Sequence, residues 1–125
     1  MTIERIRIPD LFANPLMPHA VVHGGVAYLS GVLGTVDGAG AIPDDIEDEI
    51  EACLRNVITE AEGAGSAAGR LLSVTVYLAD LSHGPLMNSV WDRVLPRDAR
   101  PARATIGSLL PAGLRIEITA VAAVG

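Results

Sequence analysis

A regular alternation of side chains near the end of the chain limits the folds that it can adopt. Between residues 115 and 124 every second residue is aliphatic, and the residues between them begin with charged and polar side chains. The aliphatic set is Ile116, Ile118, Ala120, Ala122 and Val124, and the polar set is Arg115, Glu117 and Thr119. This period of two is typical of a β-strand with one buried face. We therefore expect a sheet with an apolar face and a second face that carries functional groups.

Other patterns predict the elements around that strand. Strands are expected at residues 2–8, in a hairpin at 19–31, at 70–80 and around Arg103, and helices at 44–62 and 82–95. A strand that follows a helix that followed a strand predicts a right-handed crossover and parallel pairing. The predicted fold class is α+β: one domain over residues 1–125, a mixed sheet and two helices on one face.

The helix at residues 44–62 has the clearest boundaries. Asp44 is a candidate N-cap with Glu47 three positions later, and Gly63 and Gly65 end the helix. Its apolar stripe consists of Ile46, Ile50, Leu54, Val57, Ile58 and Ala61. The acidic residues at its start suit the positive end of the helix dipole, so they are interpreted as structural and not as a calcium site.

Two helices can cover only one side of the expected sheet. The other side would remain open although the strands are strongly apolar. The simplest partner for such a face is a second copy of the same chain. The sequence therefore predicts a homo-oligomer.

Charge and composition narrow the possible functions. The formal net charge is −6 and there is no lysine, so nucleic acid is not an expected partner. The single cysteine, Cys53, is expected to be a buried small hydrophobe, and it excludes an internal disulfide. No apolar run approaches the length of a membrane span, and the start of the chain lacks the pattern of a secretory signal. A cytoplasmic location without membrane contact is therefore expected.

Two opposite charges interrupt runs that otherwise have the character of buried strands. Arg103 lies in the run 101–107, and Glu117 lies in the run 115–119. A guanidinium fixed on a strand is a planar, permanently charged fork that suits a carboxylate, and a carboxylate near it could position water. The alternative is a surface ion pair worth about 0–1 kcal/mol.

The same two runs resemble the C-terminal signature of the RidA (YjgF) family of imine and enamine deaminases. Pro101-Ala102-Arg103-Ala104-Thr105 is followed by Leu110-Pro111 and by Arg115-Ile116-Glu117-Ile118. Upstream, Ala20-Val21 with Gly24 and Tyr28-Leu29-Ser30-Gly31 is similar to the family's N-terminal hairpin. The likeness implies a chorismate-mutase-like (YjgF-type) fold and a barrel-like homotrimer with sites in the clefts between subunits.

The resemblance also assigns roles to residues. It implies that Arg103 holds the carboxylate of a 2-imino acid and that Glu117 positions the hydrolytic water and moves protons. Ser30 and Gly31 would offer a hydroxyl and a backbone amide to the substrate, although Gly31 is equally well explained as a turn residue. Asn88 resembles an asparagine common in the second helix, which helix structure explains about as well.

Two positions depart from the family pattern. Thr105 stands where many members carry a cysteine, so no thiol is expected in the site. Met17 stands where many members carry a tyrosine that lines the pocket, which suggests a more apolar substrate preference. His19 lies close to Met17 in the sequence and is a further candidate pocket residue. The histidines form no set with metal-ligand spacing, so no metal is expected.

The resemblance implies an enzyme without a cofactor that hydrolyses reactive 2-imino and enamine acids to 2-keto acids and ammonia. Its partners would be the small imino or keto acid and the other subunits. Two alternatives stay open. One is a pathway-specific deaminase for a substrate of the aminomuconate or aminoacrylate type. The other is a non-catalytic, chaperone-like trimer that binds small carboxylates.

Overall fold

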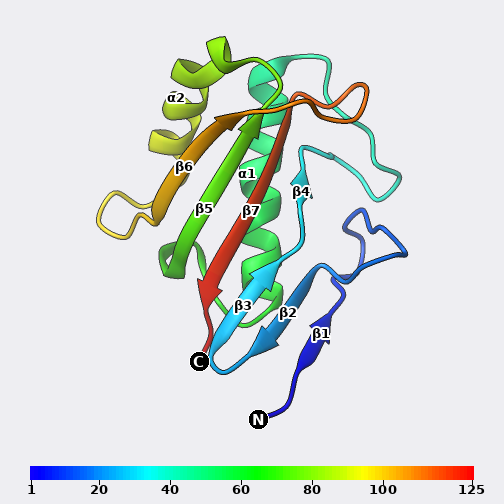
Figure 1. The fold of residues 1–125 in the computed structure, drawn as a ribbon, viewed down its shortest axis with the longest axis vertical. Coiled ribbons are helices and arrows are strands. Elements are labelled where there is room, and N and C mark those ends of the chain that lie inside the picture. Colours follow the sequence, from blue (N-terminus) through cyan, green and yellow to red (C-terminus); the bar gives the residue numbers. More distant parts are fainter.

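The computed structural model describes residues 1–125 as one mixed sheet with helices packed against it (Figure 1). The strands are β1 (Glu4–Ile6), β2 (Ala20–His23), β3 (Val26–Leu29), β4 (Val32–Leu33), β5 (Leu71–Leu78), β6 (Ala102–Gly107) and β7 (Ile116–Ala123). The α-helices are α1 (Ile46–Gly63) and α2 (Gly84–Val94), and short 3-10 helices at Ala68–Arg70 and Leu81–His83 precede β5 and α2. The predicted α+β class is confirmed.

The last strand, β7, lies in the middle of the sheet. The strand order is β1-β2-β3-β7-β5-β6, and the short β4 also pairs with β7. The parallel pairing predicted for the strands on either side of α1 is wrong, because β7 lies between β4 and β5 and pairs antiparallel with both. A central position gives this long alternating strand hydrogen-bonded neighbours on both edges. Parallel pairing occurs instead between β5 and β6, which α2 connects.

Both helices cover the same face of the sheet, as predicted (Figure 1). The residues buried between the helices and the sheet include Ile50, Leu54, Val57, Val74, Val76, Leu78, Met87, Val90, Ile116 and Ile118. Burial of each large aliphatic side chain stabilises the fold by about 1.5–3 kcal/mol. The alternation predicted for β7 is confirmed, because its buried residues are the predicted aliphatic ones from Ile116 to Ala122.

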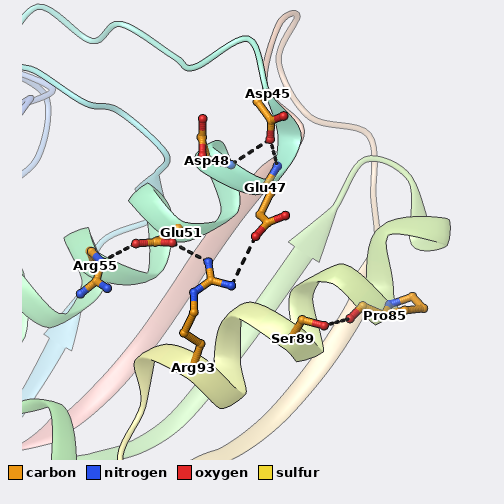
Figure 2. A network of polar contacts seen from close by, with 8 residues as sticks. All are labelled: Asp45, Glu47, Asp48, Glu51, Arg55, Pro85, Ser89 and Arg93. Atoms are coloured by element: carbon orange, nitrogen blue, oxygen red, sulfur yellow. Dashed lines mark hydrogen bonds and ion pairs between the residues drawn. The ribbon is translucent and has the colours of Figure 1, made fainter.

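The start of α1 differs by one residue from the prediction. Asp45, and not Asp44, is the N-cap, and its carboxylate accepts hydrogen bonds from the backbone N–H groups of Glu47 at 2.8 Å and Asp48 at 3.3 Å (Figure 2). Asp44 lies before the cap, where its carbonyl oxygen accepts a hydrogen bond from Arg115 at 2.9 Å. The acidic first turn therefore has the structural role that the sequence suggested.

Arg115 does not share the open face with Glu117, which corrects the expected alternation at that end of β7. Its Nε donates to the fully buried carboxylate of Glu49 at 2.6 Å, and its Nη2 donates to the carbonyl oxygens of Pro43 and Asp44. The residue precedes β7, so the strand geometry does not fix the direction of its side chain. Arg115 ties the start of β7 to the start of α1.

The outer surfaces of α1 and α2 are joined by exposed ion pairs. The Arg93 guanidinium on α2 lies between the carboxylates of Glu47 and Glu51 on α1, and Glu51 also contacts Arg55 (Figure 2). Exposed pairs of this kind each contribute only about 0–1 kcal/mol. Their main consequence here is that the arginines are occupied by neighbouring carboxylates.

The sheet face opposite the helices has no cover within the chain. Its side chains alternate with the buried ones and include Tyr28, Thr75, Tyr77, Ile106, Glu117, Thr119 and Val121. Two large side chains on it are strongly exposed, Tyr28 at 53% and Ile106 at 44%. This face is the one from which the sequence predicted self-association.

Candidate active site

Arg103 is held against α2 by two contacts. Its Nη2 donates to Asn88 Oδ1 at 2.5 Å, and its guanidinium carbon lies 4.8 Å from the centroid of the Trp91 ring. The stacking uses the negative face of the indole, and the amide oxygen fixes one side of the fork. Partial burial lowers the pKa of Arg103, which remains far above neutrality for a guanidinium. The side chain is therefore a positioned cation, and it remains exposed to solvent.

Thr105 lies two residues further along β6 and points to the same side of the sheet. It pairs across the ladder with Val76, as Arg103 pairs with Val74, and both valines are buried beneath the helices. The Thr105 hydroxyl oxygen is buried and has no hydrogen-bond partner. Arg103, Asn88 and Thr105 thus form one group at the edge of the helix-covered face.

Glu117 lies on the opposite face of the sheet. It pairs with Tyr77 on β5 and with Leu33 on β4. Its carboxylate packs so closely against Gly31 that a Cβ on that glycine would overlap Glu117 Oε2. Gly31 is needed here for this close approach, because its φ is not in the left-handed region. The need for a glycine at position 31 is therefore better explained by the adjacent Glu117 carboxylate than by a turn.

A pocket of about 220 Å³ lies beside Glu117 and Gly31. The loop between β1 and β2, the bend between β3 and β4, α1 and the segment before β7 all contribute to its wall. Three further predicted residues line it: Met17, His19 and Ser30. The structure therefore brings together five of the predicted site residues at this place.

Ser30 and His19 are already engaged in hydrogen bonds. The Ser30 hydroxyl donates to the Pro18 carbonyl oxygen at 2.8 Å. His19 Nδ1 accepts from the Ile8 backbone N–H at 2.9 Å, and Nε2 lies 2.9 Å from the Phe12 carbonyl oxygen, to which it must donate. This pattern requires a neutral imidazole that closes the loop between β1 and β2. His19 shapes the pocket, and its ring has no free nitrogen for a substrate.

The predicted residues form two separate groups within one chain. Arg103, Asn88 and Thr105 lie at the helix-covered side of β6, whereas Glu117 and its neighbours lie on the other face, beyond β5. Within a single chain, Arg103 and Glu117 therefore lie on opposite faces of the sheet. The reason is the register: Arg103 pairs with the inward-facing Val74, and Glu117 pairs with the outward-facing Tyr77.

Two residues near these groups were not identified from the sequence. Trp91 is a buried residue of α2, and its ring supports Arg103. Glu60 lines the pocket from α1 and is only 4% exposed. A signal for Glu60 was present, because it lies on the apolar side of α1 between the buried Val57 and Ala61.

Comparison with known proteins places this geometry in a family. Residues 12–124 match the family model described as Endoribonuclease L-PSP. Reactive Intermediate Deaminase A, chloroplastic, of Arabidopsis thaliana is 30% identical over 105 residues, which cover 82% of this chain and 56% of that protein. The crystal structure of RidA from an Antarctic Psychrobacter species superposes with a TM-score of 0.90 at 26% identity, over 97% of this chain and 99% of that one. The chain belongs to the Endoribonuclease L-PSP (RidA/YjgF) family.

Membership of the RidA/YjgF family confirms the resemblance found in the sequence. All predicted site residues, from Met17 to Glu117, fall within the matched range. Another relative, "Protein mmf1, mitochondrial" of Schizosaccharomyces pombe, is 31% identical over 121 residues, which cover 94% of this chain and 74% of that protein. Neither helix has the length and apolar composition needed to cross a membrane. The cytoplasmic location remains a prediction.

Proposed function

We propose that the chain is a cofactor-independent hydrolase that converts reactive 2-imino acids and their enamine tautomers to 2-keto acids and ammonia. The observation that supports this most directly is the positioned guanidinium of Arg103, backed by Trp91 and held by Asn88. The opposite end of its fork is free to bind a planar carboxylate. The relatives named reactive intermediate deaminase give the reaction class.

The complete site would be built by two copies of the chain. Arg103 and Glu117 lie on opposite faces of one sheet, so one protomer cannot direct both groups at a small substrate. A neighbouring copy that packs its open face near β6 would bring its own Glu117 toward Arg103. The homotrimer implied by the family resemblance would supply such an arrangement, and the exposed Tyr28 and Ile106 would be covered in it.

In this site Arg103 would bind and orient the substrate carboxylate, and Glu117 of the neighbouring copy would hold a water molecule over the C=N carbon. The water oxygen bonds to that carbon, and one water proton passes through the Glu117 carboxylate to the imine nitrogen. The resulting carbinolamine loses its hydroxyl proton to Glu117, which returns it to the amine. The C–N bond then breaks, the C=O bond forms, and ammonia leaves.

The departures from the family pattern bear on the substrate. Thr105 carries no thiol, so the proposed reaction contains no covalent thiol step. Met17 is an exposed, apolar side chain at the pocket wall. It favours imines whose side chain has an apolar part that can contact this methionine. An imine of the aminomuconate or aminoacrylate type would use the same Arg103 contact.

A ribonuclease function, which the name of the family model includes, is less well supported for this chain. Five of the nine arginines are occupied in ion pairs with carboxylates, and there is no lysine. With a net charge of −6, few cations remain to neutralise phosphates.

The test is the release of keto acid from an imine generated in solution. An amino-acid oxidase would produce 2-iminopropanoate or 2-iminobutanoate, and the rate would be compared with spontaneous hydrolysis. Wild type should accelerate release, and Arg103→Ala should lose most of the acceleration. Arg97→Ala is the matched control, because Arg97 lies in an exposed pair with Asp92 and makes no hydrogen bond to a residue of either group. Equal rates for wild type and Arg103→Ala would reject the proposal, and binding of keto acids without acceleration would favour the non-catalytic alternative.

A further inference from the structure

The pocket beside Glu117 reaches inward to α1, where its wall contains a carboxyl group without a partner. Glu60 lines the pocket and is only 4% exposed, although carboxylates are rarely buried unless they are paired. Burial raises the pKa of Glu60 to about 8, and no hydrogen bond or charged group offsets this effect. A buried acid that lines a cavity and lacks a partner in the chain is complementary to a ligand.

The other polar groups of the pocket do not satisfy Glu60. Asn56 donates its amide hydrogens to Leu33 and Thr35, and both His19 nitrogens are engaged in the loop. No arginine lines the pocket, and its second ionisable carboxyl is Glu117. The pocket therefore has acidic groups and hydrogen-bond acceptors but no cation of its own.

Three carboxylates at or beside α1 lie close enough to the Cys53 thiol to raise its pKa. Burial is the main cause that raises the pKa of Cys53, and the charges of Glu49, Glu117 and Glu60 raise it further. Glu49 is neutralised by Arg115. Within the chain, neither Glu60 nor Glu117 has such a partner, so a positive ligand is the missing complement of this region.

We propose that this pocket is a recognition site for a small organic ammonium group, which Glu60 binds as a carboxylate. In the empty pocket Glu60 holds its proton at neutral pH. An ammonium group within hydrogen-bond distance favours the ionised form, so binding releases the Glu60 proton to solvent and forms a charge-assisted hydrogen bond.

The ammonium group could belong to a free amine or to the side chain of a substrate that also carries a carboxylate. The second case rests on the proposed function, because the carboxylate would then lie on Arg103 of a neighbouring copy while the side chain enters past Glu117. The same pocket chemistry serves both cases, so the ligands used in the test must separate them.

The test is calorimetric titration of the full-length protein at pH 7 with three stable probes: pentylamine, 5-aminopentanoate and pentanoate. Both amines should bind about tenfold or more tightly than pentanoate, the effect of one charge-assisted hydrogen bond. Titration in two buffers with different protonation enthalpies should show release of about one proton per site. Tighter binding of 5-aminopentanoate than of pentylamine assigns the ammonium to a carboxylate-bearing ligand, and equal binding assigns it to a free amine.

Glu60→Gln keeps the size of the protonated side chain, so it should fold, and it should lower amine affinity about tenfold and abolish proton release. Glu62→Gln is the matched control, because Glu62 lies on the same helix and is exposed; it should bind like wild type. The proposal is overturned if wild type binds neither amine, binds without releasing protons, or is matched by Glu60→Gln. Amine binding by a protein that releases no keto acid from imines would remove the deaminase proposal and leave this site intact.

Discussion

Arg103 and Glu117 project from opposite faces of one sheet, from β6 and β7, with β5 between them. The first is held by α2 on the helix-covered side, and the second packs against Gly31 on the open side. A reaction that needs both groups therefore needs two chains.

Mixing two inactive variants should restore activity. In the proposed ring, each site takes Arg103 from one copy and Glu117 from the next. A site is therefore intact when a Glu117→Ala chain supplies Arg103 and an Arg103→Ala chain supplies Glu117. Equal amounts, unfolded and refolded together, should regain about a quarter of wild-type keto-acid release, because each site draws its two residues from independently chosen chains. Each variant refolded alone is the control. If mass spectrometry shows mixed oligomers and they remain inactive, the shared site is wrong.

Gly31→Ala should reduce imine hydrolysis strongly while the protein stays folded. The added Cβ would overlap Glu117 Oε2, so the carboxylate must rotate away from its place at the pocket. A displaced general base typically costs about 10²–10⁴-fold in rate. Gly84→Ala is the control, because nothing lies within 4 Å of the position of its Cβ. Steady-state rates and melting curves for both variants check this prediction, which fails if Gly31→Ala keeps full activity.

Glu60 should make the folded state less stable as the pH rises from about 4.5 to about 8. Its pKa is about 8 in the folded chain and its ordinary value is 4.5, so between these values the folded state binds more protons than the unfolded state. The free energy of unfolding should fall by up to about 1.4 kcal/mol per pH unit, and this decrease is complete above pH 8.

Denaturant unfolding at fixed protein concentration, from pH 4 to pH 9, compares wild type with Glu60→Gln. The free energy of unfolding of the variant, minus that of wild type, should increase across this window. The exposed carboxyls with lowered pKa values, such as Asp92, are present in both proteins and cancel in the difference. A difference that stays constant with pH contradicts the buried, unpartnered state of Glu60.

Removing Arg115 should destabilise the protein far more than removing an exposed arginine. Arg115→Met leaves the fully buried Glu49 carboxylate without its ion pair, which typically costs about 3–5 kcal/mol. Arg55→Met removes an exposed i,i+4 pair with Glu51 and should cost less than about 1 kcal/mol. Urea unfolding measures both, and replacing Glu49 by leucine in the Arg115→Met background should recover part of the loss. Similar costs for the two arginine variants would show that Glu49 does not depend on Arg115.

Much of the architecture could be predicted from the sequence because it depends on local periodicity. The alternation in β7 identified its buried face, and the stripe and acidic start of α1 located that helix to within one residue of its N-cap. The same patterns misplaced Arg115, whose side chain leaves the strand direction to reach Glu49. They placed Glu60 on the apolar side of α1 but could not show that it lines a pocket, because the pocket depends on the loop packed beside that helix.

The sequence by itself determined the two helices and the long strands, and it identified Arg103 and Glu117 as candidate functional charges. It could not determine that they face opposite ways, because β6 lacks an alternating pattern and the direction of its side chains depends on its pairing with β5. Only the tertiary structure decided that register, since hydrogen bonding between strands distant in sequence fixes the face of every residue. The same packing closed the loop between β1 and β2 over Glu60, and so turned a residue of a helix into the inner wall of a pocket.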